Sequence, residues 1–249
     1  MPELPETETI ARDLDREITG RRIVGVRVER ADVLRLVGAR ELARRVTGTT
    51  INRAWRRAKL VVLDLSSGDR VVVQPRFTGA LLIDGGMLPD GERRYTAVEF
   101  ELDDGRSLRY RDVRRLGTVA LMSNEQFRQY SAALGAEPLD PAFTDAHLSA
   151  LVRGRRQAIK KVLMDQRVIA GVGNIYANEA LRGVLGESIN HRGTSFRDYR
   201  DASGARGGFV EHLAVYGRAG RPCARCGRRL IGTHAIDGRM TVLCAHCQR

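Results

Sequence analysis

The stretch LVVLDLSSGDRVVV, residues 60–73, decides the fold of the N-terminal half of the chain. Leucine and β-branched side chains fill residues 60–65 and 70–73, and the Ser, Gly and Asp residues between them favour a turn. The pattern recurs between residues 49 and 122, where further strands are predicted at 97–102 and 107–110. These short strands predict antiparallel hairpins that form a sandwich or a barrel.

A helix is predicted before the strands. In residues 7–19 apolar side chains recur at four-residue steps, acidic residues crowd the first turn, and Gly20 follows the last turn. Residues 23–29 then alternate like a strand. One helix followed by many strands is typical of an α+β domain.

The chain becomes helical after residues 134–141, where two Pro and a Gly predict a linker. Helical periodicity appears in three segments, at residues 146–152, 159–166 and 175–185. Residues 195–208 are polar and rich in Gly and Arg, which predicts a mobile loop. We therefore expect three domains, at residues 1–134, 135–215 and 216–249.

Arginine supplies nearly all of the positive charge. The formal net charge is +12, and Lys59, Lys160 and Lys161 are the only lysines. A balance this basic indicates a polyanionic partner such as nucleic acid, although a GC-rich genome also enriches arginine. No segment approaches the ~18 consecutive apolar residues of a membrane helix. Acidic residues stand where a signal peptide needs an apolar core, so we expect a cytoplasmic protein with no membrane partner.

All four cysteines lie in the C-terminal segment. Cys223 and Cys226 form one C-x2-C pair, and Cys244 and Cys247 form another, with 17 residues between the pairs. This spacing is typical of a zinc ribbon, in which four thiolates close a tetrahedral site and leave no open position. We therefore expect one structural Zn²⁺. The alternative is that the cysteines are redox pairs or free thiols. His234 and His246 could act as substitute zinc ligands, but the four cysteines already complete the metal site.

A hairpin is predicted between the two cysteine pairs. Residues 230–235 and 240–243 can pair as strands, with Asp237 and Gly238 as turn residues. Arg239 would then stand at the tip, where a rigidly presented guanidinium suits a phosphate or a minor groove. If Arg239 were an isolated exposed arginine, its presence would not indicate a contact with DNA.

The first six residues, Met1-Pro2-Glu3-Leu4-Pro5-Glu6, suggest a catalytic amine. Removal of Met1 before a small residue would leave Pro2 with a free secondary amine, which titrates near pH 8 and is nucleophilic. That amine can attack an electrophilic sugar carbon and form an iminium, with Glu3 as general acid. The alternative is an ordinary N-terminus stiffened by Pro2 and Pro5.

Several segments together resemble the formamidopyrimidine-DNA glycosylase family, which also contains endonuclease VIII. In chain order they are PELPE, RRAK around Lys59, RYRDVRRLG around Arg114, MDQRVIAGVGNIYANEAL, VYGRAGRPC, and GRMT before Cys244. The resemblance implies an N-terminal antiparallel β-sandwich flanked by helices, then a helix–two-turns–helix domain with a four-cysteine zinc ribbon. It also implies a bifunctional glycosylase and AP lyase of base-excision repair, which removes oxidised purines and cuts the strand by β,δ-elimination.

The resemblance also implies roles for individual residues. Pro2 would attack C1′ of the damaged nucleotide, and Glu3 would protonate the sugar ring oxygen. Lys59 would bind a phosphate or assist near the lesion, and Arg239 would complete the catalytic set. The expected DNA-binding residues are Glu6, Gln74, Phe77, Arg114, Arg115, Leu116 and Asn174.

Three of these residues also have ordinary interpretations. Asn174 suits a cap for the helix predicted to begin at Ile175. Lys59 suits a solvated position on a strand, and Glu6 suits the positive end of the first helix dipole.

Three segments depart from the family pattern. Gln74-Pro75-Arg76-Phe77 stands where relatives have His-Leu-Gly-Met, and Asp112-Val113-Arg114-Arg115-Leu116 stands where relatives have Asp-Pro-Arg-Arg-Phe. We expect Phe77, Arg114 and Leu116 to fill the void left by a flipped base. The chain is also short between Leu185 and Thr194. This predicts a reduced helical domain with less apolar packing behind the expected Ile175 helix.

The expected partner is double-stranded DNA containing damaged bases, bound by a monomer at the nucleoid. PELPE favours the oxidised-purine branch, because the endonuclease VIII branch more often has Gly where Leu4 stands. The alternatives are an enzyme for oxidised pyrimidines or abasic sites, and a ribbon protein that binds damaged DNA without chemistry.

Overall fold

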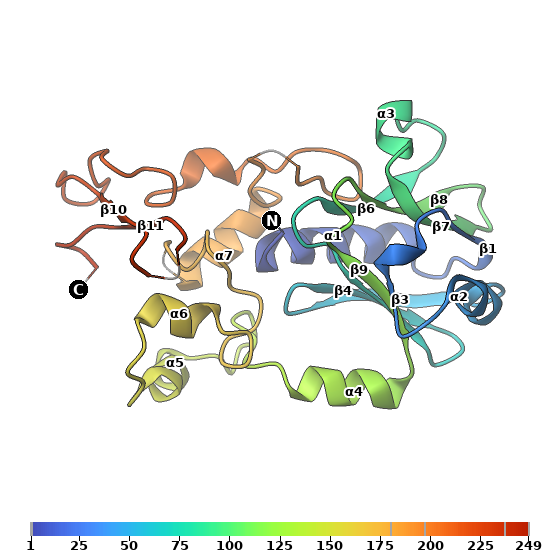
Figure 1. Cartoon of the computed structure of the whole chain (residues 1–249), viewed down its shortest axis with the longest axis horizontal. Coiled ribbons are helices and arrows are strands. Elements are labelled where there is room, and N and C mark those ends of the chain that lie inside the picture. The colour runs from blue at the N-terminus through green and yellow to red at the C-terminus, as the bar shows by residue number, and fades with distance from the viewer. Residues whose placement is uncertain (1, 180, 197, 237, 249) are drawn as a thin grey trace.

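Two stacked sheets form a β-sandwich, which lies on the right of Figure 1. The computed structural model describes residues 2–179, 181–196, 198–236 and 238–248. The four-stranded sheet has the order β1 (Ile23–Val28), β7 (Thr96–Leu102), β8 (Ser107–Asp112), β6 (Gly79–Asp84). The five-stranded sheet has the order β2 (Leu34–Arg35), β9 (Thr118–Met122), β5 (Arg70–Gln74), β4 (Leu60–Leu65), β3 (Ile51–Arg57). Neighbours are antiparallel except β2 and β9, so the predicted antiparallel sandwich is confirmed.

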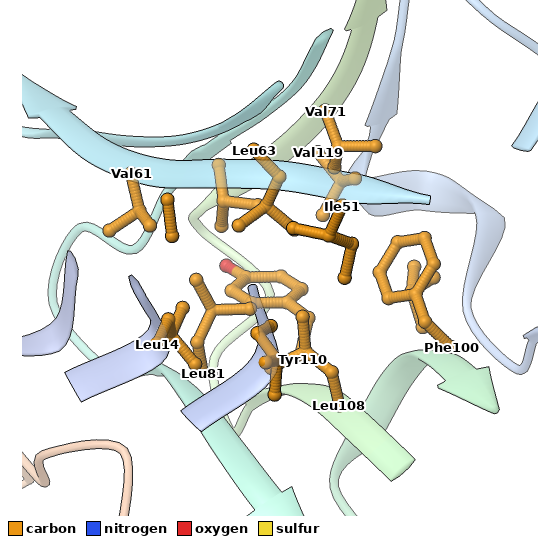
Figure 2. Close-up of a cluster of buried hydrophobic side chains, with 14 of the residues drawn as sticks. Leu14, Ile51, Val61, Leu63, Val71, Leu81, Phe100, Leu108, Tyr110 and Val119 are labelled. Carbon is orange, nitrogen blue, oxygen red and sulfur yellow. The ribbon is translucent and has the colours of Figure 1, made fainter. Parts of the chain in front are cut away.

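Strands β4 and β5 read as continuous apolar runs because both of their faces are buried. Val61, Leu63 and Val71 point into the main core between the sheets, where they face Tyr110 of β8 (Figure 2). Alternate residues of the same strands point the other way, onto Phe127 of α4 (Asn124–Ala132). The hairpin predicted at residues 60–73 is therefore the centre of the domain.

Helix α1 (Leu4–Ile18) joins two hydrophobic cores. Ile10 and Leu14 belong to the sandwich core, whereas Leu4 packs in a second core with Val172 and Tyr176 of the C-terminal part. The helix begins three residues earlier than predicted, because Pro5 lies in the first turn, where no intrahelical donor is needed. The first residues of the chain are consequently fixed at the boundary between the two cores (Figure 1).

Shorter helices complete the N-terminal and middle parts. They are η1 (Ala31–Val33), α2 (Ala39–Val46), α3 (Asp90–Arg93), α5 (Asp145–Val152), α6 (Ile159–Met164), α7 (Leu181–Asn190) and η2 (Phe209–His212). The helices predicted at 146–152 and 159–166 correspond to α5 and α6.

The helix predicted at residues 175–185 is wrong in its first half. Residues 174–178 form turns, and the helix of this region is α7, which runs on to Asn190. The amides of Gly173 and Ile175 at the start of these turns donate to the side chain of Glu3, and the amides of Ala177 and Glu179 each donate to the carbonyl four residues earlier. Ile175 and Tyr176 are both buried in the second core, and a helical domain reduced relative to the family stays a prediction.

Residues 134–141 cross between the domains but are anchored. The amide of Gly135 donates to the Gln166 carbonyl at 2.8 Å, and Ala136 forms a parallel bridge with Ile169. The loop at 195–208 is likewise held, by a bridge between Thr194 and Gly208. No helix in the described part of the chain is long and apolar enough to cross a membrane.

The C-terminal module is a small hairpin, far to the left in Figure 1. Its strands β10 (Ile231–Thr233) and β11 (Thr241–Leu243) are antiparallel, as predicted. The predicted turn residue Asp237 lies outside the described residues, as does Met1.

Candidate active site and nucleic-acid interface

The carboxylate of Glu3 is buried in a cradle of backbone amides. Its oxygens accept hydrogen bonds from the amides of Gly173 (2.8 Å), Ile175 (3.0 Å) and Tyr176 (3.4 Å). A side chain at position 173 would overlap this carboxylate, so only glycine fits there. The amide of Leu4 donates to the carbonyl of Gly171 at 3.0 Å and holds the two segments in register. These contacts fix the orientation of Glu3, and with it the adjacent, buried Pro2.

Glu6 lies beneath Glu3 in a closed polar network. It is 0 % exposed and accepts hydrogen bonds from the amides of Glu3 and Thr194, both at 2.8 Å. The hydroxyl of Tyr176 donates to it at 2.6 Å and also contacts Ser188. Burial raises the pKa of Glu6, and the negative charge of Glu3 raises it further.

The expected direct DNA contact of Glu6 is therefore wrong for this conformation, because its carboxylate is fully enclosed. Glu6 instead forms part of a capping box at the start of α1, where its carboxylate accepts from the amide of Glu3.

Lys59 lies in the turn between β3 and β4 and faces the same site. Burial lowers the pKa of its ammonium group, partly offset by the attraction of Glu3. Lys59 is half-buried and its charge interacts with that of Glu3, so it differs from the solvated strand lysine of the alternative interpretation. The positive φ of Ala58 (+53°) shapes the turn that presents it.

One pocket brings together four of the predicted residues. It has a volume of about 320 Å³, and its lining includes Lys59, Gln74, Phe77 and Arg239. The four come from three separate places in the chain: the β3–β4 turn, the segment that follows β5, and the ribbon hairpin. The charge of Arg239 lies near enough to contribute to lowering the pKa of Lys59.

Asn174 lies in the turn that cradles Glu3. Its side-chain oxygen Oδ1 is buried and has no hydrogen-bond partner among the described residues. Because no helix begins at Ile175, the capping interpretation of Asn174 is wrong. A buried amide oxygen without a partner costs about 1–3 kcal/mol, so this group is suited to a ligand that the protein does not supply.

The loop between β8 and β9 carries exposed apolar side chains. Val113 is 37 % exposed and Leu116 is 39 % exposed, and Phe77 beside the loop is 42 % exposed. The guanidinium of Arg114 lies over the ring of Phe77, 5.6 Å from its centroid. The loop is held from inside by Asp112, which accepts from the amides of Arg114 (3.2 Å) and Gly117 (2.8 Å). Two of the three predicted void-filling residues are thus in contact.

Arg115 is separate from this group. Its guanidinium pairs with Asp32 at 2.9 Å, and it lines a different pocket of about 510 Å³ with Arg30 and Arg94.

The sequence analysis did not assign a role to Val113 of the β8–β9 loop, although an apolar residue in a basic loop is the signal that would have found it.

The four cysteines converge as their spacing predicts. Their sulfur atoms all lie within 4.8 Å of one another, and Cys226 and Cys244 are 3.5 Å apart. Backbone amides, with that of Cys247 foremost, lower the pKa of Cys244 and favour the thiolate that binds metal. This set of four sulfur donors can hold a metal ion.

Three residues that the sequence analysis left without a role connect this ribbon to the active-site turn. Asn178 accepts from the amide of Val242 at 2.8 Å, and Lys160 donates to Thr241 at 2.6 Å. The carboxylate of Glu179 accepts from the amides of residues 214–216, which lead into the ribbon. Such long-range contacts join distant segments, so no local pattern signals them.

Two family models match this chain. The formamidopyrimidine-DNA glycosylase N-terminal domain matches residues 1–119, and the formamidopyrimidine-DNA glycosylase H2TH domain matches residues 134–184. The chain belongs to the formamidopyrimidine-DNA glycosylase family. It is 40% identical over 276 residues to the formamidopyrimidine-DNA glycosylase of Xanthomonas campestris pv. campestris, and both chains are covered completely.

Solved glycosylase structures share the whole fold. A complex between a Lactococcus lactis FPG mutant and a Fapy-dG containing DNA aligns with a TM-score of 0.88 and 28% identity, covering 100% of both chains. A complex of the wild-type L. lactis protein with an oxidized pyrimidine containing DNA aligns with a TM-score of 0.86 and 27% identity, again over 100% of both chains. The chain therefore has the fold of this DNA glycosylase family from end to end.

Proposed function

We propose that this protein is a bifunctional DNA glycosylase and AP lyase that removes oxidised purines, 8-oxoguanine and formamidopyrimidines, from double-stranded DNA. The observation that carries the proposal is the junction at the start of α1. There Glu3, next to the buried Pro2, accepts hydrogen bonds from the amides of Gly173, Ile175 and Tyr176. Its charge acts on Lys59, which lines one pocket together with Arg239.

Pro2 is the proposed nucleophile once Met1 has been removed. Its nitrogen forms a bond to C1′ of the damaged nucleotide while the bond from C1′ to the base breaks. The base leaves with the electron pair and takes up the proton that the amine nitrogen loses. Glu3 supplies a proton to the sugar ring oxygen as the C1′–O4′ bond opens, which leaves an iminium between Pro2 and C1′. The iminium acidifies C2′, and loss of that proton expels the 3′ phosphate; δ-elimination then expels the 5′ phosphate.

Lys59, Arg239 and Asn174 are proposed to hold the phosphates beside the extruded nucleotide. A base within a duplex is out of reach, so the nucleotide must leave the stack and the kinked backbone must be gripped on both sides. Two cationic side chains at one pocket are suited to this task, and the side-chain NH2 group of Asn174 can donate to a phosphate oxygen.

Phe77, Arg114 and Leu116 are proposed to fill the space left by the base. A half-exposed aromatic ring and an exposed leucine can enter the stack, and the fork of Arg114 can pair with the orphaned base. Gln74 and Arg115 are proposed to contact the backbone nearby.

The metal of the ribbon is proposed to be one structural Zn²⁺ bound by Cys223, Cys226, Cys244 and Cys247. Four sulfur donors leave no position for substrate, so the ion takes no part in the reaction.

We propose that the protein acts on DNA as a monomer in the cytoplasm. Its proposed domains are residues 1–134, 135–215 and 216–249.

An enzyme for oxidised pyrimidines or abasic sites is the second candidate. The observation that favours it is the altered pair of void-filling segments, together with the L. lactis relative crystallised with an oxidized pyrimidine containing DNA. The two candidates share the chemistry of Pro2 and differ in the lesion.

Single-turnover cleavage of matched duplexes tests the proposal. The duplexes carry 8-oxoguanine, formamidopyrimidine, dihydrouracil or an abasic site, with undamaged DNA as control. We expect the two purine lesions to be cleaved fastest among the damaged bases. Faster cleavage of dihydrouracil would overturn the purine assignment in favour of the second candidate. Binding of damaged DNA without any cleavage would show a non-catalytic protein.

A further inference from the structure

A second cluster of metal-ligating side chains lies far along the chain from the four cysteines. It consists of Glu187 on α7, His191 directly after this helix, and His212 at the end of η2. One potential ligand atom from each lies within 4.8 Å of those of the other two. The imidazole rings of His191 and His212 are close, with centroids 3.9 Å apart.

The backbone brings these three side chains together by regular means. Glu187 and His191 are four residues apart, and the amide of His191 donates to the Glu187 carbonyl at 3.1 Å. This helix-like spacing continues directly after α7 and puts both side chains on one face. His212 lies on the other side of the cluster. Its ring stacks on that of Phe209, and the two ring centroids are 5.7 Å apart. The cluster is accessible, because Glu187 and His212 are exposed and His191 is half-buried.

The donor set selects a class of metal. Two imidazole nitrogens and one carboxylate oxygen suit borderline first-row dications such as Zn²⁺ or Ni²⁺ and are poor ligands for Mg²⁺ or Ca²⁺. Zinc–ligand bonds of about 2.0–2.2 Å place donor atoms roughly 3.3 Å apart. Ligand atoms that lie within 4.8 Å of one another therefore need to move closer by at most about 1.5 Å. Three protein ligands leave a further position for water.

The cluster lies at the base of the loop at residues 195–208, so a bound metal would affect how this loop is held. His191 and His212 bracket the loop at residues 195–208, whose base is already closed by the bond from the Gly208 amide to the His191 carbonyl at 2.9 Å. A metal ion bridging the two histidines would add a second closure at this base. Local opening of the loop would then require the loss of a metal–ligand bond.

We propose that Glu187, His191 and His212 form a second site for a divalent transition metal, which clamps the base of the loop at residues 195–208. The proposal concerns surface residues outside the pocket of Lys59 and Arg239, so it stands or falls independently of the lesion that is removed.

Calorimetric titration with Zn²⁺ tests the site, using full-length protein whose ribbon already holds one equivalent of zinc. We expect a second equivalent to bind with micromolar affinity. His191→Gln and His212→Gln should weaken this second event at least tenfold. His147→Gln, which removes an exposed histidine of α5, should bind like the wild type. No second equivalent in the wild type, or an unchanged second event in His212→Gln, would overturn the site.

Hydrogen–deuterium exchange tests the clamp. Addition of the second equivalent should slow amide exchange in residues 194–209 in the wild type and leave it unchanged in His212→Gln. If the metal binds and exchange in this loop does not change, the clamp is wrong.

Discussion

At the scale of single residues, Gly173 sets how closely the turn approaches Glu3. We expect Gly173→Ala to displace the Glu3 carboxylate, because the added methyl group would overlap it. Overpacking of this kind costs about 1–3 kcal/mol, and we expect single-turnover cleavage of an 8-oxoguanine duplex to slow by at least about tenfold. Gly186→Ala in α7 is the matched control, because a methyl group there meets nothing within 4 Å. Equal rates for the two variants would show that the cradle does not position Glu3.

Glu6 makes the stability of the protein depend on pH. Its pKa is raised by burial, so the ionised carboxylate is disfavoured in the folded state. The stability that wild-type Glu6 contributes relative to Glu6→Gln is fully present below its unfolded pKa of about 4.5 and declines as the pH rises through the folded value. Urea unfolding of both proteins between pH 4 and 8 measures this difference.

Glu17→Gln, on the exposed face of the same helix, controls for the loss of charge. A difference between wild type and Glu6→Gln that stays constant or grows with pH would contradict a raised pKa.

At the scale of elements, the ribbon hairpin depends on its metal to present Arg239. Strands of three residues each, β10 and β11, form an isolated two-stranded hairpin, which is marginal without support. Cys244→Ser should therefore release most of the bound zinc, measured by atomic absorption, and weaken DNA binding at least about tenfold, since structural zinc binding supplies folding energy. Arg225→Ser, within the first cysteine pair but not a sulfur donor, should keep the metal. Full DNA affinity in metal-free Cys244→Ser would contradict this role.

The elements also show where sequence patterns succeed and fail. The strands at 60–65 and 70–73 were predictable because both faces are buried, so the apolar signal is continuous. The helix predicted at 175–185 is wrong in its first half, where residues 174–178 form turns. These turns pack on Glu3, which is 170 residues from Gly173, and no local pattern signals that contact. The convergence of the four cysteines followed from their spacing alone.

At the scale of the whole molecule, a buried ion network fixes the two domains to each other. Glu137 accepts a hydrogen bond from the guanidinium of Arg57 at 2.7 Å and forms an ion pair with that of Arg56, with 2.6 Å between nitrogen and oxygen. It also accepts from the amide of Ala58 at 2.7 Å, beside Lys59. Arg57 donates in turn to the carbonyls of Leu134 and Gly135, both at 3.0 Å. The network thus connects the interdomain crossing directly to the active-site turn.

Glu137→Gln should loosen this junction. Burial opposes ionisation of Glu137, but the two guanidiniums, with Arg56 foremost, outweigh it and lower the pKa. The stability from this group is therefore present at neutral pH and is lost as the pH falls through the lowered folded pKa. We expect the variant to lose about 1–3 kcal/mol at pH 7 in urea unfolding, and less at pH 3.

Glu125→Gln breaks an exposed pair with Arg128 and should cost well under about 1 kcal/mol. An equal loss in the two variants would show that the junction is no stronger than a surface ion pair.

The site itself was only partly predictable. Pro2, Glu3, Lys59 and Arg239 were assigned through resemblance, and the structure gathers three of them around one pocket and its neighbouring cradle. The partners that position them were not assigned, because Gly173, Tyr176 and Glu137 act across 79 residues or more of chain. Only a folded chain reveals such contacts.

Borohydride trapping tests the central claim most directly. The protein is incubated with an 8-oxoguanine duplex and borohydride, which reduces an iminium to a stable bond. The account predicts a covalent protein–DNA adduct that peptide mapping locates at the nitrogen of Pro2. Pro2→Gly should lose most of the adduct, whereas Pro5→Ala should keep it. No adduct on any lesion or abasic duplex, or an adduct mapped to Lys59, would contradict the account.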